Sequence, residues 1–197
     1  HGMRRITLNL IFCIQILLLF LLFTADRIDL PAWLQVAGRL HPLVLHLPIG
    51  FLIFLAMMFF FRNQIEKNSF QQMVGIGLLI TSFFASVAAL FGFFLSLQDD
   101  YGSSVLTQHK ATGVILSWFC YLLILLQSNN RNRKILYGLG GVTLVLLVVV
   151  GHTGAILTHG QNFVFAPITA KKELTADNAS VYEFAVQPIL DQKCFSC

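Results

Sequence analysis

The chain has 197 residues, of which 56% are hydrophobic and only 11% are charged, and its net charge is +4. Its mean hydropathy is +0.75. A water-soluble domain of this length cannot bury so much apolar surface, so the composition excludes a soluble globular protein. The sequence therefore predicts a polytopic membrane protein whose surroundings are the lipid bilayer, and no nucleic-acid partner is expected.

Five apolar runs are long enough to cross the hydrocarbon core, which needs about 20 helical residues. The connections between them are short and carry nearly all of the charge, which favours antiparallel neighbours. The expected fold class is an all-α membrane protein, a five-helix antiparallel transmembrane bundle within residues 6–160. Its helices are expected at residues 6–23, 43–61, 73–97, 111–126 and 135–157. Residues 1–5 are expected to be a cytoplasmic N-terminus, with His1 as a cloning remnant.

Basic residues gather at one end of the expected bundle, and the positive-inside rule makes that end cytoplasmic. They are Arg4, Arg5, Arg62, Lys67, Arg131, Arg133 and Lys134, and the opposite end carries Asp26, Asp29, Asp99 and Asp100. The N-terminus is then cytoplasmic and the tail after Gly160 periplasmic, as in a multi-pass protein of the bacterial inner membrane. The first run could be mistaken for a signal peptide, but Phe23 near the possible cleavage site argues against its removal.

The histidines other than His1 all lie at the predicted outer ends of the helices, and ionisable residues at membrane depth favour a functional role. They are His41, His46, His109, His152 and His159. Seven residues separate His152 from His159, which places them on one helix face about 10 Å apart. Pro48 removes a backbone donor from the carbonyl of Val44 and predicts a kink beside His46.

Two histidines that face each other from different helices can supply both axial ligands of b-type haem. We expect His46 and His152 to do so because their depths match, with His109 and His159 available for a second haem. His41 is a weaker candidate, since a residue before Pro42 can simply begin a helix. Hydrogen bonds between helices are the alternative for these side chains.

Zinc or copper could use the same four residues, His46, His152, His109 and His159, as metal ligands. The membrane segments contain no carboxylate to act as a general base or as a mixed ligand, which argues against a zinc hydrolase. Among the metal sites considered, haem therefore suits these segments better.

Two motifs resemble a known family. "GRLHPLVLHLPIG" and the later "GHTGAILTHG" resemble the bacterial polytopic membrane domain of unknown function 2231 over about residues 38 to 165. The resemblance implies that His41, His46 and His159 are important, and it does not name their ligand.

The tail "YEFAVQPILDQKCFSC" is similar to the start of planctomycete-type cytochrome c domains, in which C-x-x-C followed by His attaches haem c. The resemblance implies that Cys194 and Cys197 form thioethers to haem c if the chain continues past Cys197 with His. A disulfide outside the cell, or no role, are the alternatives for this pair. Cys13 and Cys120 are expected to be small apolar fillers.

Residues 161–180 are expected to form a linker, and residues 181–197 the truncated start of the cytochrome c-like domain. The spacing of Ser180 and Glu183 fits a capping box, which predicts a short helix from Val181 to near Pro188.

These features predict an electron-transfer component rather than a self-contained enzyme. It would hold one or two b-type haems near its periplasmic face, exchange electrons with quinol or another redox protein, and tether a cytochrome c domain. One alternative is a structural membrane anchor without cofactor that displays an external domain. Another is a metal or proton conduit, which the scarcity of polar residues in the inner halves of the helices disfavours.

Overall fold

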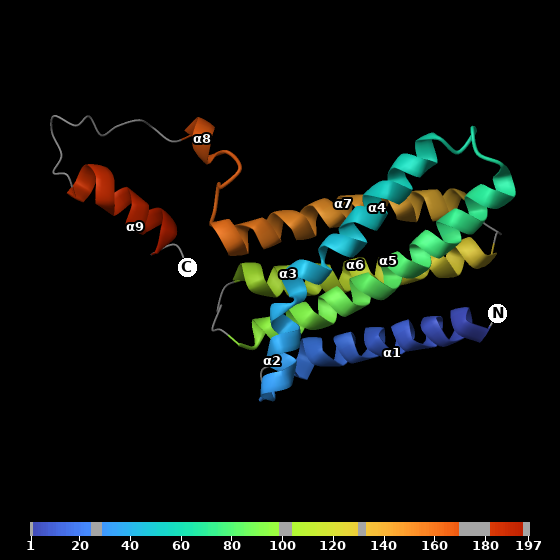
Figure 1. Ribbon diagram of the computed structural model, residues 1–197, viewed down its shortest axis with the longest axis horizontal. Helices are drawn as coiled ribbons and strands as arrows, with labels where there is room; N and C mark the ends of the chain where they lie inside the picture. Colours follow the sequence, from blue (N-terminus) through green and yellow to red (C-terminus); the bar gives the residue numbers. More distant parts are fainter. Residues whose placement is uncertain (1, 25–28, 99–103, 130–132, 170–181, 195–197) are drawn as a thin grey trace. The chain divides into compact units, whose positions relative to one another are not determined.

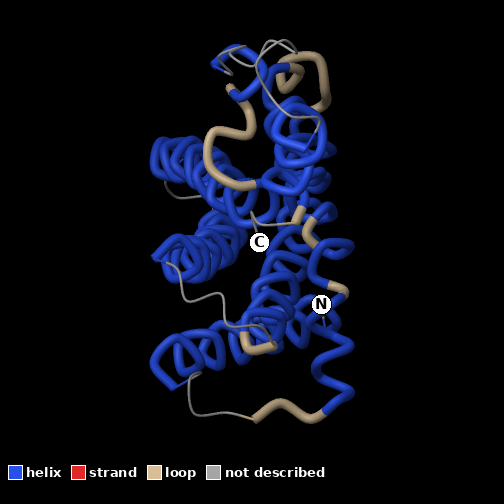
Figure 2. Tube along the Cα trace, turned by 90° about the vertical axis from the view of Figure 1, so that its left-hand side faces the viewer, coloured by secondary structure: helices blue, strands red, loops and turns tan. Residues whose placement is uncertain are grey.

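In the computed structural model, the described residues form helices joined by loops, and Figure 2 shows no strand among them. The structure describes residues 2–24, 29–98, 104–129, 133–169 and 182–194.

The chain divides into two compact units, His1–Val150 and Gly151–Cys197, and each is described by itself. The helices in chain order (Figure 1) are α1 (Gly2–Thr24), α2 (Ala32–Arg39), α3 (His41–Val44), α4 (His46–Phe60), α5 (Lys67–Ser96), α6 (Ser104–Asn129), α7 (Arg133–His159), α8 (Ala166–Thr169), the π-helix η2 (Tyr182–Val186) and α9 (Gln187–Lys193).

Five helical segments are long and apolar enough to cross a membrane, which confirms the predicted number and the all-α fold class. Helices run past the ends of the predicted apolar runs. The third, for example, begins at Lys67 rather than Met73. Polar side chains prolong a helix without difficulty, because the backbone hydrogen bonds that define it do not depend on apolar side chains. The orientation across the membrane stays a prediction.

Residues 32–39, which were expected to belong to the connection before the second predicted helix, are themselves helical. The helical segment that includes α2, α3 and α4 covers Ala32–Phe60. Pro31, in an extended conformation, precedes the first turn of α2, where its fixed φ and missing N–H are tolerated. Polar residues had suggested a loop at this point, but the segment bonds to Gln98, just after the end of α5. Gln98 donates to the Gln35 carbonyl at 2.8 Å, and Arg39 donates to the Gln98 side chain at 3.2 Å.

Gly38 sets the close approach of α2 to α5. It is buried, and a Cβ built on it would lie 2.7 Å from the backbone nitrogen of Leu95. Any larger side chain would therefore push the two helices apart.

The predicted kink beside His46 is confirmed. Helix α3 ends at Val44 and α4 begins at His46, with Leu45 in a turn between them. Pro48 has no N–H to donate to the Val44 carbonyl, and the next bond, from Ile49 to the Leu45 carbonyl, is long at 3.4 Å. The kink divides the second span into segments with different directions (Figure 1).

Helix α5 is the centre of the first unit, because α1, α2, α3, α4 and α6 all pack against it. One core cluster joins α1, α5 and α6 through Ile11, Leu78 and Ile124. A second cluster joins the same three helices further along, through Leu18, Phe93 and Val114. The core of the unit therefore lies between α1, α5 and α6, while the outer faces of these helices remain apolar and exposed, as lipid contact requires.

Glu66 caps the N-terminus of α5. Its carboxylate accepts hydrogen bonds from the backbone amides of Asn68 at 2.9 Å and Ser69 at 2.7 Å. These bonds stabilise the charged form, the Asn68 amide most of all, and hold the pKa of Glu66 below its usual value. The Glu66 carboxylate therefore acts as the N-cap of α5.

In the second unit, α7 ends at His159, and the next residue, Gly160, has a φ of +83°, which suits a residue without a side chain. The short tail helix does not end near Pro188 as predicted. The π-helical turn η2 leads directly into α9, and Pro188 lies in the first turn of α9, where its missing N–H costs nothing. Helix α9 therefore continues to Lys193. Ser180 and Val181 lie outside the described residues.

Candidate functional site

His41 begins α3 and lies against α5. Its Nδ1 atom is 2.8 Å from the backbone carbonyl oxygen of Ala88. The ring also faces Gly92, where an added Cβ would lie 3.0 Å from the imidazole Cε1 atom. A glycine at this position therefore makes room for the ring, which is half-buried between the two segments.

The Ala88 carbonyl decides which nitrogen of His41 carries the proton. A carbonyl oxygen can only accept, so Nδ1 must be the donor, and in the neutral ring Nε2 then holds the lone pair. This is the arrangement that metal-binding histidines commonly show, with one ring nitrogen bonded to a carbonyl and the other bound to the metal. Because the carbonyl belongs to α5, it also fixes the orientation of the ring.

His109 of α6 lies in the same region of the first unit. It is half-buried near His41, and its ring bonds to the backbone of Val150. The structure therefore brings together two imidazoles from separate helices, α3 and α6, each with a backbone partner. Sequence analysis gave no reason to pair these two residues.

The remaining candidate histidines are more exposed. His46, at the start of α4, is exposed, and no hydrogen bond of its ring is found among the described residues. His152 belongs to the second unit and is exposed within α7. His159, at the end of α7, stacks on Phe163 with a 4.3 Å distance between ring centroids. The pairing of His46 with His152 joins residues of different units and stays a prediction.

Metal clusters with three or more ligands do not occur in the described part of the chain, counting His, Cys, Asp and Glu. Cys194 is exposed at the C-terminal end of α9, and Cys197 lies outside the described residues. The thioether and disulfide alternatives for that pair therefore stay predictions. Cys120 is fully buried, as expected of an apolar filler, whereas Cys13 is exposed.

Sequence analysis missed a polar junction in the core. Gln15 of α1 is fully buried and donates from Nε2 to the hydroxyl of Ser86 on α5 at 2.9 Å. Its carbonyl oxygen accepts from the hydroxyl of Ser117 on α6 at 3.0 Å. This junction joins the three central helices. The signal was present, because Gln15 is the one amide within the otherwise apolar stretch 10–23.

Comparison with protein families gives one match. A model described as "Predicted membrane protein (DUF2231)" matches residues 38–163, more than half of the chain, and this confirms the resemblance noted for the two histidine motifs. The matched region includes all five candidate histidines and ends before Cys194, so it does not bear on the similarity of the tail to cytochrome c domains. Neither the curated proteins nor the solved structures provide a match.

Proposed function

This chain belongs to the DUF2231 family of predicted membrane proteins, and on that premise we propose that it is a membrane-embedded electron-transfer protein that binds b-type haem. The observation that carries the proposal is the contact between His41 Nδ1 and the Ala88 carbonyl at 2.8 Å. It leaves Nε2 of His41 as a lone-pair donor in a fixed orientation, as an axial ligand requires.

The geometry favours His41 and His109 as the first ligand pair. They come from different segments of one compact unit, and each ring has a backbone partner that restrains it. This order differs from the one expected from depth alone, which placed His46 and His152 first and His41 last. His46, His152 and His159 remain candidates for a second haem.

A pair of histidines suits haem better than a free metal ion. The porphyrin supplies four nitrogen ligands in its plane, so the protein needs to add only two imidazoles. A structural zinc site instead needs about four protein ligands, and a catalytic one about three. No group of three or more candidate ligands occurs in the part of the chain that the structure describes.

The C-terminal tail would add a second haem site to the proposed protein. If His follows Cys197, then Cys194 and Cys197 would attach haem c, and that domain would exchange electrons with the membrane haem. Quinol or another redox protein would be the second partner. Haem c is attached outside the cytoplasm, on the side where the basic residues predict that the tail lies.

The test is the visible spectrum of the full chain, expressed with ample haem, purified, and compared in reduced and oxidised forms. A pyridine haemochrome assay separates b-type from c-type haem. We expect His41→Ala and His109→Ala each to abolish the low-spin b-type spectrum, while His46→Ala, on an exposed residue, retains it. Membrane insertion of every variant is checked by fractionation.

Two outcomes would contradict the proposal. Wild-type protein without b-type absorbance would make the histidines hydrogen-bonding groups of a structural anchor. Loss of the spectrum in His46→Ala and His152→Ala, with retention in His41→Ala, would restore the ligand pair expected from depth.

A further inference from the structure

A cavity of about 610 Å3 lies within the first unit, between α4, α5, α6 and α7. Its walls are largely apolar and include Leu52, Leu78, Leu123 and Leu144. A volume of this size is typical of sites that enclose small amphipathic molecules. The cavity is far from the histidines, because Gln71 in its lining and Ala88 beside His41 are about 26 Å apart along α5.

The polar part of the lining is cationic. It includes Arg62, Lys67 and Arg133, together with the amides of Gln71 and Gln127, and none of the described lining residues is a carboxylate. Glu66 precedes Lys67 directly, but its carboxylate is bonded to amides of the first turn of α5. The cavity therefore offers positive charge to a ligand at the end of the bundle that the positive-inside rule predicts to be cytoplasmic.

Arg62 is held in place before any ligand arrives. Its guanidinium lies 4.2 Å from the centre of the Phe59 ring and donates one bond to the Phe59 carbonyl at 3.3 Å. The Phe59 ring in turn packs edge-to-face on Tyr137 at 4.8 Å between centroids. A guanidinium has five N–H donors, so most of them remain available for a phosphate group.

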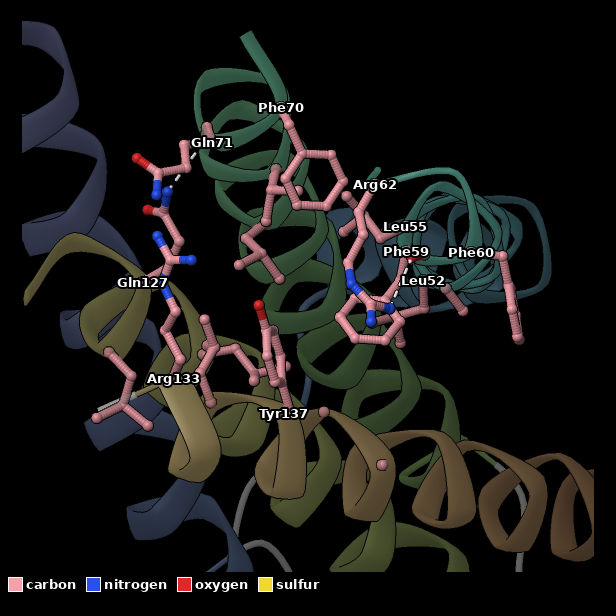
Figure 3. Close-up of a pocket in the computed structure, with 18 of the residues that line it drawn as sticks. Leu52, Leu55, Phe59, Phe60, Arg62, Phe70, Gln71, Gln127, Arg133 and Tyr137 are labelled. Carbon is pink, nitrogen blue, oxygen red and sulfur yellow. Dashed lines mark hydrogen bonds between the residues drawn. The ribbon is translucent and has the colours of Figure 1, made fainter. Parts of the chain in front are cut away.

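The two arginines lie on opposite sides of one opening. Figure 3 shows Tyr137 between Arg133, on the side of Gln127 and Gln71, and Arg62, on the side of Phe59. Gln127 is fixed there by a hydrogen bond to the Gln71 carbonyl at 3.0 Å. A headgroup in this opening can thus be contacted from both sides.

Glycines keep the α7 wall of the cavity open. Gly140 and Gly141 both line it, and a Cβ built on either one would meet no atom within 4 Å. The free space beside Gly140 and Gly141 can therefore accept carbon atoms of a ligand or of a larger side chain.

From these features we propose that the cavity binds an anionic phospholipid of the surrounding bilayer. The phosphate lies between Arg62, Lys67 and Arg133, and an acyl chain follows the apolar walls beside Gly140. Basic pockets between membrane helices recognise lipid headgroups in this way. A zwitterionic lipid would bring a second, positive headgroup charge, for which the lining provides no carboxylate. A free phosphate ion would leave the apolar walls without a partner.

The experiment titrates the purified full chain with phosphatidylglycerol or with phosphatidylcholine of the same acyl chains and counts bound lipid by native mass spectrometry. We expect selective retention of phosphatidylglycerol. Arg62→Gln and Arg133→Gln should each weaken it about five-fold, from about 1 kcal/mol for each cation near a membrane surface. Both side chains are exposed, so these variants should fold.

A matched pair of α7 variants tests the apolar part. Gly140→Leu should occupy the part of the cavity beside α7, in the path of the acyl chain, and reduce lipid retention at least ten-fold. Gly138→Leu adds the same side chain where there is also free space but outside the cavity lining, and it should retain lipid as the wild type does.

Three results would overturn the proposal. The first is equal retention of the two lipids. The second is an equal loss in Gly138→Leu and Gly140→Leu. The third is displacement of phosphatidylglycerol by a comparable concentration of inorganic phosphate, which would make the cavity a site for the free ion.

Discussion

Replacing Gly38 by alanine tests the packing of α2 on α5. A Cβ at this position would lie 2.7 Å from the backbone nitrogen of Leu95 and 2.9 Å from the carbonyl carbon of Phe94. Ordinary contact for such an atom begins near 3.4 Å, so α2 must move away from α5 by about 0.7 Å. Both obstructing atoms belong to the backbone of a central helix and cannot rotate away.

The expected energy follows from two opposing effects. Overpacking of a close contact costs about 1–3 kcal/mol, while replacing glycine by alanine inside a helix gains up to about 1 kcal/mol. Gly50 in α4 is the matched control, because a Cβ there would meet no atom within 4 Å and only the gain applies. The free energies of unfolding of Gly38→Ala and Gly50→Ala should therefore differ by about 1–3 kcal/mol, with Gly50→Ala the more stable.

The assay is unfolding of the purified protein in mixed detergent micelles, followed by far-UV circular dichroism. Gly50→Ala should unfold at higher denaturant than the wild type and Gly38→Ala at lower denaturant. Equal midpoints for the two variants would mean that α2 does not pack against α5 as described.

Three further perturbations have defined outcomes. Gln15→Leu should cost about 1 kcal/mol of unfolding free energy, and a double-mutant cycle with Ser117→Ala should give a coupling of about 0.6 kcal/mol. A coupling of zero would mean that the two side chains do not interact. Glu66 has a lowered pKa in the folded state, so its stabilising effect is complete above its unfolded pKa and is lost as the pH falls through the folded one. The difference in melting temperature between wild type and Glu66→Gln should shrink over that interval, and a constant difference would exclude the capping role. Gly92→Ala should displace the His41 ring, since its methyl group would lie 3.0 Å from Cε1. The 15N chemical shifts of His41 should report the loss of its fixed tautomer, and unchanged shifts would contradict this.

The five spans could be predicted because lipid requires long, predominantly apolar helices, and each span contains an uncharged, predominantly apolar run. The kink at Leu45 could be predicted for an equally local reason, the missing N–H of Pro48. The helix at 32–39 could not, because its polar residues looked like those of a loop. Their partner, Gln98 just after the end of α5, lies 63 residues after Gln35, and no local pattern reveals such a bond.

In the candidate site, too, local features could be predicted from the sequence and long-range contacts could not. The one-sided placement of the histidines is visible in the sequence, but the partner of His41 is a backbone carbonyl on another helix. Periodicity assigns a residue to a face of its own helix and says nothing about which carbonyl of a neighbour it meets. The space for the ring depends on Gly92, which lies on α5 and not on the helix of His41. Matching depth in the membrane therefore favoured His46 and His152 as the haem ligands, whereas the backbone contacts of the rings favour His41 and His109.

The order in which the chain is synthesised also matters for the buried amide of Gln15. Its partners Ser86 and Ser117 follow it by 71 and 102 residues, so α1 reaches the membrane well before either exists. At about 5–20 residues per second, a ribosome needs roughly 5–20 s to make the chain as far as Ser117. During that interval the side chain has no permanent partner in the hydrocarbon, where an unsatisfied amide is costly. Until α5 and α6 arrive, water, the translocation machinery or an assembly factor must accommodate it, which makes the nascent first span the most vulnerable stage in the biogenesis of this protein.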